Sequence, residues 1–282
     1  MSAATIDAAL NWASGLLTGS DSPRLDAQVL LCHQLQRPRS YLFAHGDRLL
    51  SALDWQGFQQ LVAARASGQP VAYLVGEREF WSLPLMVSAA TLIPRPDTEA
   101  LVAHALTLPI APKARVADLG TGSGAIALAL ASERPDWQLW ACDRSPEALA
   151  MAAANGTRLA LTNVQFCAGD WYQALPMAAV PLQLIISNPP YLAPLDPHLG
   201  EGDLRFEPVT ALVADDDGLA DLRLLIAQAH HYLEPRGYLL LEHGATQGPA
   251  VAALMAAHGF EPQPVLDLAG HWRGCCGQLG GC

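Results

Sequence analysis

The chain has 282 residues, of which 51% are hydrophobic, so it can bury a sizeable core in one large or two ordinary domains. Its formal net charge is −11, and Lys113 is the single lysine. Binding to duplex DNA requires that several phosphates be neutralised, so this charge argues against a broad nucleic-acid surface. We expect no direct contact with nucleic acid, whereas a basic protein partner stays open.

The six cysteines are too few for a disulfide framework in a chain of this length. They carry no Cys-x-x-Cys or similar ligand spacing, so no metal site is expected. A reducing cytoplasm is the simplest setting. Those in apolar segments are predicted to be small core residues, and the others cluster near the C-terminus: Cys32, Cys142 and Cys167, then Cys275, Cys276 and Cys282.

Two segments bear on membrane targeting. Met1–Leu17 has no basic region followed by a long apolar stretch, so it is not expected to be a signal peptide. Trp171–Leu195 carries no charge and is long enough to suggest a membrane span. A spanning helix would not tolerate its prolines, so we expect no membrane insertion: Pro176, Pro181, Pro189, Pro190 and Pro194.

Residues 1–75 are predicted to form an N-terminal helical domain. Ser22-Pro23 is typical of an N-cap followed by proline at the first helical position, and Leu25, Val29 and Leu30 have helical spacing. This part carries no phosphate loop and no obvious catalytic group, so it is expected to pack against or recognise a partner. Residues 76–92 resemble a β-hairpin linker around Ser82-Leu83-Pro84.

Residues 93–282 are predicted to form the larger domain, whose first helix starts near Asp97 and Thr98. Strands and helices then alternate, which indicates an α/β fold with a mostly parallel sheet covered on both faces. The expected strands are Val116–Leu119, Gln138–Cys142, Val164–Cys167, Leu182–Ser187 and Tyr238–Leu241, and the expected helices include Ala125–Ala131, one opened by Ser145-Pro146-Glu147, and Leu219–Leu233.

Chemically capable residues follow four of these strands. Gly120, Asp143, Asp170 and Asn188 each stand at or just beyond a strand end. Right-handed crossovers place these ends on one edge of the sheet, where ligands bind in open α/β folds. We therefore predict a site at that edge.

The turn after the first of these strands, Gly120-Thr121-Gly122-Ser123-Gly124, is predicted to bind a nucleotide-like cofactor. Glycine allows close approach of the backbone, and the following helix offers free N–H groups. Gly120, Gly122 and Ala125 also satisfy the G-x-G-x-x-G/A dinucleotide pattern, so this turn alone leaves a nicotinamide dehydrogenase open.

Three further residues are candidates for the same cofactor. Asp143 can accept hydrogen bonds from both ribose hydroxyls, although it could instead cap the helix before Ser145. Asp170 can accept from an adenine amino group. Trp171 can cover the adenine ring, with a core tryptophan as the alternative.

Asn188-Pro189-Pro190-Tyr191 indicates the reaction. An amide nitrogen is a poor nucleophile, so its methylation requires acceptors that orient both N–H bonds. The Asn188 side-chain oxygen and the Pro189 carbonyl can serve, since consecutive prolines hold that carbonyl rigidly, while Tyr191 packs against the planar group. A dehydrogenase has no use for this arrangement. We therefore predict catalytic roles for Asn188, Pro189 and Tyr191, and S-adenosylmethionine as cofactor.

At this point the chain resembles the HemK/PrmC family of S-adenosylmethionine-dependent protein-(glutamine-N5) methyltransferases. The stretches that carry the resemblance include Ser22–Ala27, Gly76–Trp81, Leu92–Glu99, Glu207–Leu212, Asp217–Leu219 and Asp267–Gly270. Asn-Pro-Pro-Tyr is shared with nucleic-acid amino-group methyltransferases, whereas Arg95-Pro96-Asp97-Thr98-Glu99 favours the release-factor enzymes over those that modify a ribosomal-protein glutamine.

The resemblance implies a class I (Rossmann-like) methyltransferase domain preceded by a small helical substrate-recognition domain. It implies an enzyme that modifies the glutamine in the Gly-Gly-Gln loop of peptide chain release factors. We expect this enzyme to act as a monomer. Gly120–Gly124, Asp143, Trp171 and Asn188 would contact the cofactor, and Asn188–Tyr191 the glutamine. The alternatives are methylation of a nucleic-acid amino group or of a ribosomal-protein glutamine.

The Gly- and Cys-rich end, His271–Cys282, departs from the family pattern and is poor in β-formers, so the final sheet strand usual in the family stays open there. Arg95 and Glu99 match family positions without a clear role. A salt-bridged junction between domains is their alternative reading.

Overall fold

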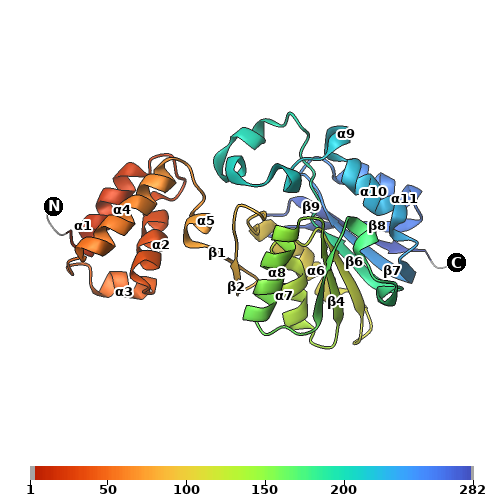
Figure 1. Ribbon diagram of the computed structural model, residues 1–282. Helices are drawn as coiled ribbons and strands as arrows, with labels where there is room; N and C mark the ends of the chain where they lie inside the picture. The colour runs from red at the N-terminus through yellow and green to blue at the C-terminus, as the bar shows by residue number, and fades with distance from the viewer. Residues whose placement is uncertain (1–3, 281–282) are drawn as a thin grey trace. The chain divides into compact units, whose positions relative to one another are not determined.

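The computed structural model describes residues 4–280 and divides into two compact units (Figure 1). The first unit takes the chain up to Glu77 together with His198–Phe206. The second takes Arg78–Pro197 together with the chain from Glu207 onward. Each unit is described by itself.

The first unit is helical, as its apolar periodicity predicts. Thr5 and Ser51 cap two of its helices, because each side-chain oxygen accepts a hydrogen bond from a backbone N–H in the first turn. Pro23 occupies the first position of its helix, but the Ser22 hydroxyl donates to Asp26 and does not cap. The helices are α1 (Ile6–Leu16), α2 (Pro23–Leu35), α3 (Arg39–Ala44), α4 (Ala52–Ala66) and α5 (Val71–Val75).

Apolar residues from these helices form one buried cluster, which includes Ile6, Leu30, Phe58 and Val62. An ion pair lies beside it, because the Arg65 guanidinium contacts Asp26 at 2.8 Å and Asp203 at 3.1 Å. The unit therefore has its own core and its own polar anchor.

The second unit begins with β1 (Glu77–Phe80) and β2 (Leu83–Met86), which pair with each other in a small separate sheet. A short 3₁₀ turn, η1 (Pro96–Thr98), then leads into α6 (Glu99–Thr107). The Glu99 carboxylate accepts the backbone N–H of Trp81 at 2.8 Å. Glu99 thus stabilises the turn between the paired strands.

Within the described residues, the main sheet has seven strands in the order β5-β4-β3-β6-β7-β9-β8. The chain moves outward from β3 to β5 and then crosses back to β6 on the other side of β3, which makes the β3–β6 boundary a topological switch point. The strands are β3 (Arg115–Leu119), β4 (Gln138–Asp143), β5 (Val164–Ala168), β6 (Leu182–Ser187), β7 (Leu233–Glu242), β8 (Phe260–Leu266) and β9 (Trp272–Leu279).

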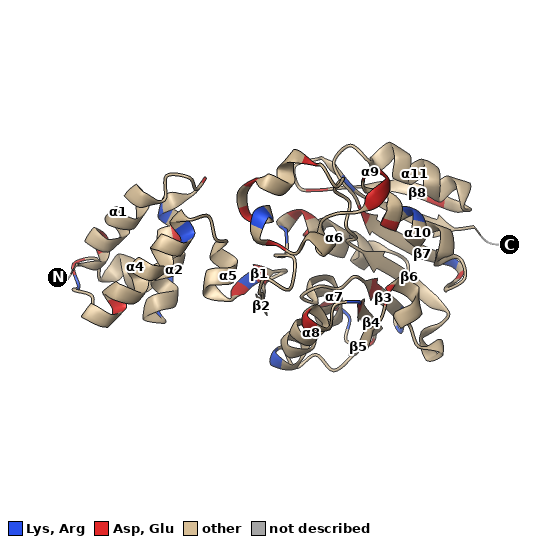
Figure 2. Cartoon of the chain, turned by 45° about the horizontal axis from the view of Figure 1, so that its top comes forward, with Lys and Arg blue, Asp and Glu red and all other residues tan. Residues whose placement is uncertain are grey.

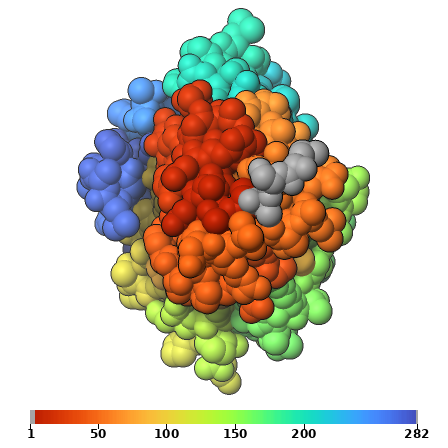
Figure 3. Space-filling model, turned by 90° about the vertical axis from the view of Figure 1, so that its left-hand side faces the viewer, coloured from red at the N-terminus to blue at the C-terminus, as the bar shows by residue number. Residues whose placement is uncertain are grey.

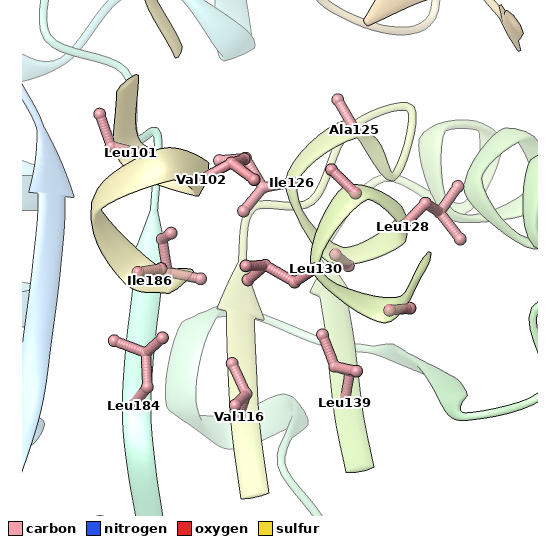
Figure 4. Close-up of a cluster of buried hydrophobic side chains, with 14 of the residues drawn as sticks. Leu101, Val102, Val116, Ala125, Ile126, Leu128, Leu130, Leu139, Leu184 and Ile186 are labelled. Carbon is pink, nitrogen blue, oxygen red and sulfur yellow. The ribbon is translucent and has the colours of Figure 1, made fainter. Parts of the chain in front are cut away.

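Helices cover both faces of this sheet because successive side chains of each strand point to opposite faces. Leu184 and Ile186 of β6 join the cluster of α6 and α7 (Figure 4), whereas Ile185 joins the cluster of α10 and α11. The helices are α7 (Ala125–Glu133), α8 (Pro146–Arg158), α9 (Asp215–Gly218), α10 (Ala220–Ala229) and α11 (Gly248–Ala257). The α/β prediction is confirmed.

On the C-terminal side, the structure corrects one sequence-based prediction and decides the final strand, which the sequence left open. The helix expected to reach Leu233 ends at Ala229, because β7 already starts at Leu233. A final strand forms despite the scarcity of β-formers: Cys275 and Cys276 of β9 lie opposite Leu241 and Leu240 of β7.

Small residues suit β9 because it lies between two strands. A Cβ on Gly277 would stand 2.9 Å from Phe260 Cβ, and one on Gly274 would stand 3.1 Å from the Leu241 carbonyl oxygen. Both cysteines are buried, whereas Cys282 lies outside the described residues. Close packing therefore accounts for glycine at positions 274 and 277.

Across residues 4–280, no helix combines the length and the apolar character needed to cross a membrane. Trp171–Leu195 is divided among short 3₁₀ turns, strand β6 and loop, as its prolines predict.

Candidate functional site

The carboxyl ends of β3, β4, β5 and β6 meet around one cavity, where the sequence predicts a site. Gly120, Asp143, Asp170 and Asn188, one from each strand end, all line it. Its empty space, including the open mouth, is about 970 Å³.

Most of the predicted site residues share this cavity. Gly124, Pro189 and Tyr191 do not line it: Gly124 is the N-cap of α7, while Pro189 is buried and Tyr191 half-buried beside the cavity wall. The predicted residues that do line it are Gly120, Thr121, Gly122, Ser123, Asp143, Asp170, Trp171, Asn188 and Pro190.

The glycine turn is held from below by Asp118, which lies inside β3 and is fully buried. One oxygen of its carboxyl group accepts from the Thr121 hydroxyl at 2.6 Å and from the Ala127 N–H at 3.1 Å. Burial raises the pKa of Asp118 to about 7, although both hydrogen bonds oppose the rise. Asp118 thus fixes the turn to the start of α7.

Asp143 connects this turn to the next strand. Its Oδ2 accepts the Gly122 N–H at 2.9 Å, and its Oδ1 accepts the Ser145 N–H at 2.9 Å. Ser145 itself caps α8 by accepting the Ala148 N–H at 3.1 Å. Each carboxylate oxygen can accept further hydrogen bonds. The geometry is thus compatible with both sequence-based alternatives, ribose binding and support of the helix start.

Trp171 forms the wall opposite the glycine turn. A Cβ on Gly120 would stand 3.1 Å from Trp171 Cζ3, and Gly120 has φ +74°, so this approach requires glycine. The Trp171 side chain is hydrogen-bonded to Asp221, which steadies the indole. Asp170, just before it, is exposed at the cavity. Trp171 is therefore a wall residue in contact with the turn.

Asn188 leads into a hydrogen-bonded chain. Its Nδ2 donates to Thr98 Oγ1 at 3.2 Å, and the Thr98 hydroxyl donates to Glu242 Oε2 at 2.6 Å. The Tyr191 hydroxyl donates to Glu242 Oε1 at 3.2 Å. Asn188 and Thr98 line the cavity, whereas Glu242 and Tyr191 lie behind them.

Glu242 is 2% exposed at the end of β7. Burial raises its pKa to about 7, although its bonds to Thr98 and Tyr191 oppose the rise. Burial likewise raises the pKa of the Tyr191 phenol.

An ion pair and a hydrogen bond stabilise the rim of the cavity. Arg95 pairs with Glu207 at 2.5 Å, and Glu207 also accepts the Ile93 N–H at 3.1 Å. Arg144 donates to the Thr210 carbonyl at 3.4 Å. Arg95 and Arg144 both line the cavity with Pro208 and Ala211. Arg95 therefore anchors the segment that follows Glu207.

Thr98, Glu242, Asp118, Asp221 and Arg144 were not predicted as site residues. Glu242 follows Leu239-Leu240-Leu241 and ends a strand, so the rule that located Asn188 would also have located it. Thr98 lies far from Asn188 in the sequence, and no local signal indicates that the two side chains meet.

Comparison with known families identifies both parts of the chain. A family model described as the PrmC N-terminal domain matches residues 8–76, and a methyltransferase-domain model matches residues 110–263. A crystal structure of a methyltransferase from Pyrococcus furiosus covers 77% of this chain and 97% of its own, at 15% identity and a TM-score of 0.54. The larger unit thus has a Rossmann-like methyltransferase fold.

Relatives of high identity cover nearly the whole chain. The release factor glutamine methyltransferase of Vibrio cholerae is 51% identical over 280 residues, which are 97% of this chain and 96% of that protein. The protein of the same name from Salmonella typhimurium is 48% identical over 271 residues, covering 96% of this chain and 97% of that one. The chain therefore belongs to the release factor glutamine methyltransferase family.

Proposed function

We propose that this protein transfers a methyl group from S-adenosylmethionine to the side-chain amide nitrogen of the glutamine in the Gly-Gly-Gln motif of peptide chain release factors. The observation that carries the proposal is the placement of Asn188 on the cavity wall. Its Nδ2 is used by Thr98, which leaves the carbonyl oxygen Oδ1 to accept an N–H bond of a substrate amide.

The cavity fits the cofactor chemically. Gly122 lines it and would have nothing within 4 Å of an added Cβ, so the turn leaves room for a ligand against its backbone. Asp143 would accept from the ribose hydroxyls, Asp170 from the adenine amino group, and Trp171 would cover the ring. When bound, S-adenosylmethionine supplies a methyl group on a positively charged sulfur, which is already a good leaving group.

The chain's own contribution is orientation of the acceptor amide. The products are N-methylglutamine, S-adenosylhomocysteine and a proton, which the amide nitrogen loses as the new N–C bond forms. Asn188 Oδ1 and the Pro189 carbonyl would hold the two N–H bonds so that the nitrogen lone pair faces the methyl group. Orientation of this kind can contribute about 7–11 kcal/mol in favourable cases. No strong general base is required.

Methylation of a nucleic-acid amino group is the runner-up, because adenine also presents a planar NH2 group. A duplex binder must neutralise several phosphates and flip a base into its pocket. This chain has a net charge of −11. In the described part of the chain, Lys and Arg are dispersed rather than gathered in a stripe (Figure 2). Charge therefore favours a protein substrate.

We further propose that residues 1–75 recognise the release factor, that residues 76–92 link the two domains, that residues 93–282 carry the reaction, and that the enzyme acts as a monomer. The helical unit is coloured red to orange in the space-filling view of Figure 3. Its exposed side chains include large apolar ones, such as Phe43 and Leu53, which supports a recognition role. Exposed apolar side chains mark sites of protein contact where they gather in a contiguous patch.

One assay separates these functions. Tritiated methyl transfer from S-adenosylmethionine is measured in parallel on purified release factors, ribosomal proteins and duplex DNA. We expect label on release factors, located by mass spectrometry at the Gly-Gly-Gln glutamine. A release factor with that glutamine replaced by alanine is the control. Label on DNA with none on release factors would overturn the proposal.

A further inference from the structure

The chain from Asn188 through Thr98 to Glu242 has a direction that follows from the chemistry of its groups. An ionised carboxylate only accepts hydrogen bonds, a hydroxyl has a single proton to donate, and a side-chain amide has one donating and one accepting end. The direction of the whole chain is thus set by its buried end, Glu242.

The consequences run outward from Glu242. Its Oε2 lies 2.6 Å from Thr98 Oγ1, so the Thr98 hydroxyl donates its single proton to the carboxylate. Thr98 can then only accept from Asn188, at 3.2 Å. Asn188 must present Nδ2 to Thr98, which leaves Oδ1 of this cavity-lining residue to accept from another donor. If the Asn188 side-chain amide were flipped by 180°, its Oδ1 would face Thr98 Oγ1 with no proton between the two oxygens.

We propose that Glu242, acting through Thr98, is a positioning residue that fixes the orientation of the Asn188 amide for methyl transfer. This inference rests on the proposed function, because it assigns the polarity of the acceptor that the substrate NH2 group meets. Glu242 does not line the cavity and is 2% exposed, so it does not act as a general base on the substrate.

Tyr191 completes the arrangement at the other carboxylate oxygen. Its hydroxyl donates to Glu242 Oε1 at 3.2 Å, so each oxygen of the carboxylate has a donor. Tyr191 also accepts, through its backbone carbonyl, the Gln247 side-chain amide at 3.0 Å. The tetrapeptide is thereby tied to Glu242 through its first and last residues.

Protonation of Glu242 would remove this directional control, since a carboxylic acid can donate to Thr98 and allow Asn188 to flip. Burial raises the pKa of Glu242 to about 7. The titratable and charged groups around Glu242 are Asp97 of η1, Arg273 of β9 and Tyr191 after β6. His243 follows it in the chain, with Nδ1 2.9 Å from the Gly244 carbonyl. The turnover rate kcat should therefore rise between pH 6 and pH 8.

The test uses three variants of the full-length protein. Thr98→Val removes the hydroxyl, Thr98→Ser keeps it, and Glu242→Gln replaces an obligatory acceptor by an amide that can present either end. We expect kcat on release factor to fall by on the order of 10- to 100-fold in Thr98→Val, because the Asn188 Nδ2 donor loses its acceptor on Thr98. Glu242→Gln should lower kcat roughly 10-fold. Thr98→Ser, which keeps the hydroxyl, should retain most of the wild-type kcat.

Two readouts separate positioning from general damage. Affinity for S-adenosylhomocysteine should stay within about 2-fold of wild type, since orientation of Asn188 acts on the substrate amide. The rise of kcat with pH should be lost in Glu242→Gln. Glu234→Gln is the matched control: it makes the same change on the same strand, where Glu234 accepts from Gln183, and should keep the wild-type rate and pH profile.

The outcomes are distinct. Wild-type rates in both Thr98→Val and Glu242→Gln would overturn the inference and leave the proposed function intact. Parallel losses of rate, cofactor affinity and unfolding temperature would also overturn it, because they would indicate a purely structural role. A wild-type protein that methylates no glutamine at all would overturn the proposed function and this inference together.

Discussion

The indole of Trp171 lies against the backbone of Gly120, so close that a Cβ on Gly120 would stand 3.1 Å from Trp171 Cζ3. These residues follow β5 and β3, which are separated by β4 in the sheet. The contact closes one side of the cavity. It also explains why the first glycine of the turn cannot carry a side chain.

Gly120→Ala is expected to weaken S-adenosylhomocysteine binding by at least about 10-fold, because alanine at φ +74° is strained and its methyl group displaces Trp171. Isothermal titration calorimetry measures the change. Gly259→Ala is the control: it has φ +82° and nothing within 4 Å of the added Cβ, so it carries the same backbone strain without the indole contact. Equal affinities in the two variants would contradict a role for the contact.

Asp118→Asn should change how stability depends on pH. In the folded protein burial raises the pKa of Asp118 to about 7, whereas the unfolded chain has the ordinary value. Between these values the folded state holds the proton and the unfolded state has lost it, so wild-type stability falls as pH rises toward 7. Asparagine does not titrate.

Relative to wild type, Asp118→Asn should therefore gain on the order of 2 kcal/mol of unfolding free energy between pH 5 and pH 8. Urea denaturation at pH 5, 6, 7 and 8 measures this difference. Glu242 titrates in both proteins, so its contribution cancels from the difference between their free energies of unfolding. A constant difference between the two proteins over this range would show that Asp118 is ionised in the folded state throughout.

Much of the site could be predicted from strand ends alone. The apolar run Leu182–Ser187 followed by Asn188, and the run Gln138–Cys142 followed by Asp143, place polar groups at one edge of a parallel sheet. Ser145-Pro146 likewise predicted the start of α8, with Ser145 as its cap. These signals are local, so a single sequence is sufficient to locate them.

Features that depend on tertiary contact could not be predicted. Strand β9 forms because its cysteines and glycines fit between β7 and β8, although their intrinsic strand preference is low. The hydrogen bonds from Asn188 to Thr98 and from Thr98 to Glu242 connect residues from three separate parts of the chain. Likewise Arg95 pairs with Glu207, which lies far from it in the sequence but within the same larger unit.

Phe43→Ala tests the recognition role proposed for the helical unit. Phe43 is 70% exposed, so its loss should change the free energy of unfolding by no more than about 0.5 kcal/mol. We expect KM for intact release factor to rise several-fold and KM for a short Gly-Gly-Gln peptide to stay unchanged. Leu268→Ala, an exposed residue of the larger unit, is the control. Unchanged kinetics on both substrates would exclude Phe43 from the contact.

The most direct test of the central claim is Asn188→Ala, which removes the oriented acceptor from the cavity wall. Single-turnover methyl transfer to release factor at saturating S-adenosylmethionine measures the chemical step, and calorimetry with S-adenosylhomocysteine measures cofactor binding. Loss of one preorganised hydrogen-bond partner should slow the chemical step by on the order of 100-fold or more, with a much smaller loss of cofactor affinity. A variant that retains the wild-type single-turnover rate would show that Asn188 does not orient the substrate amide.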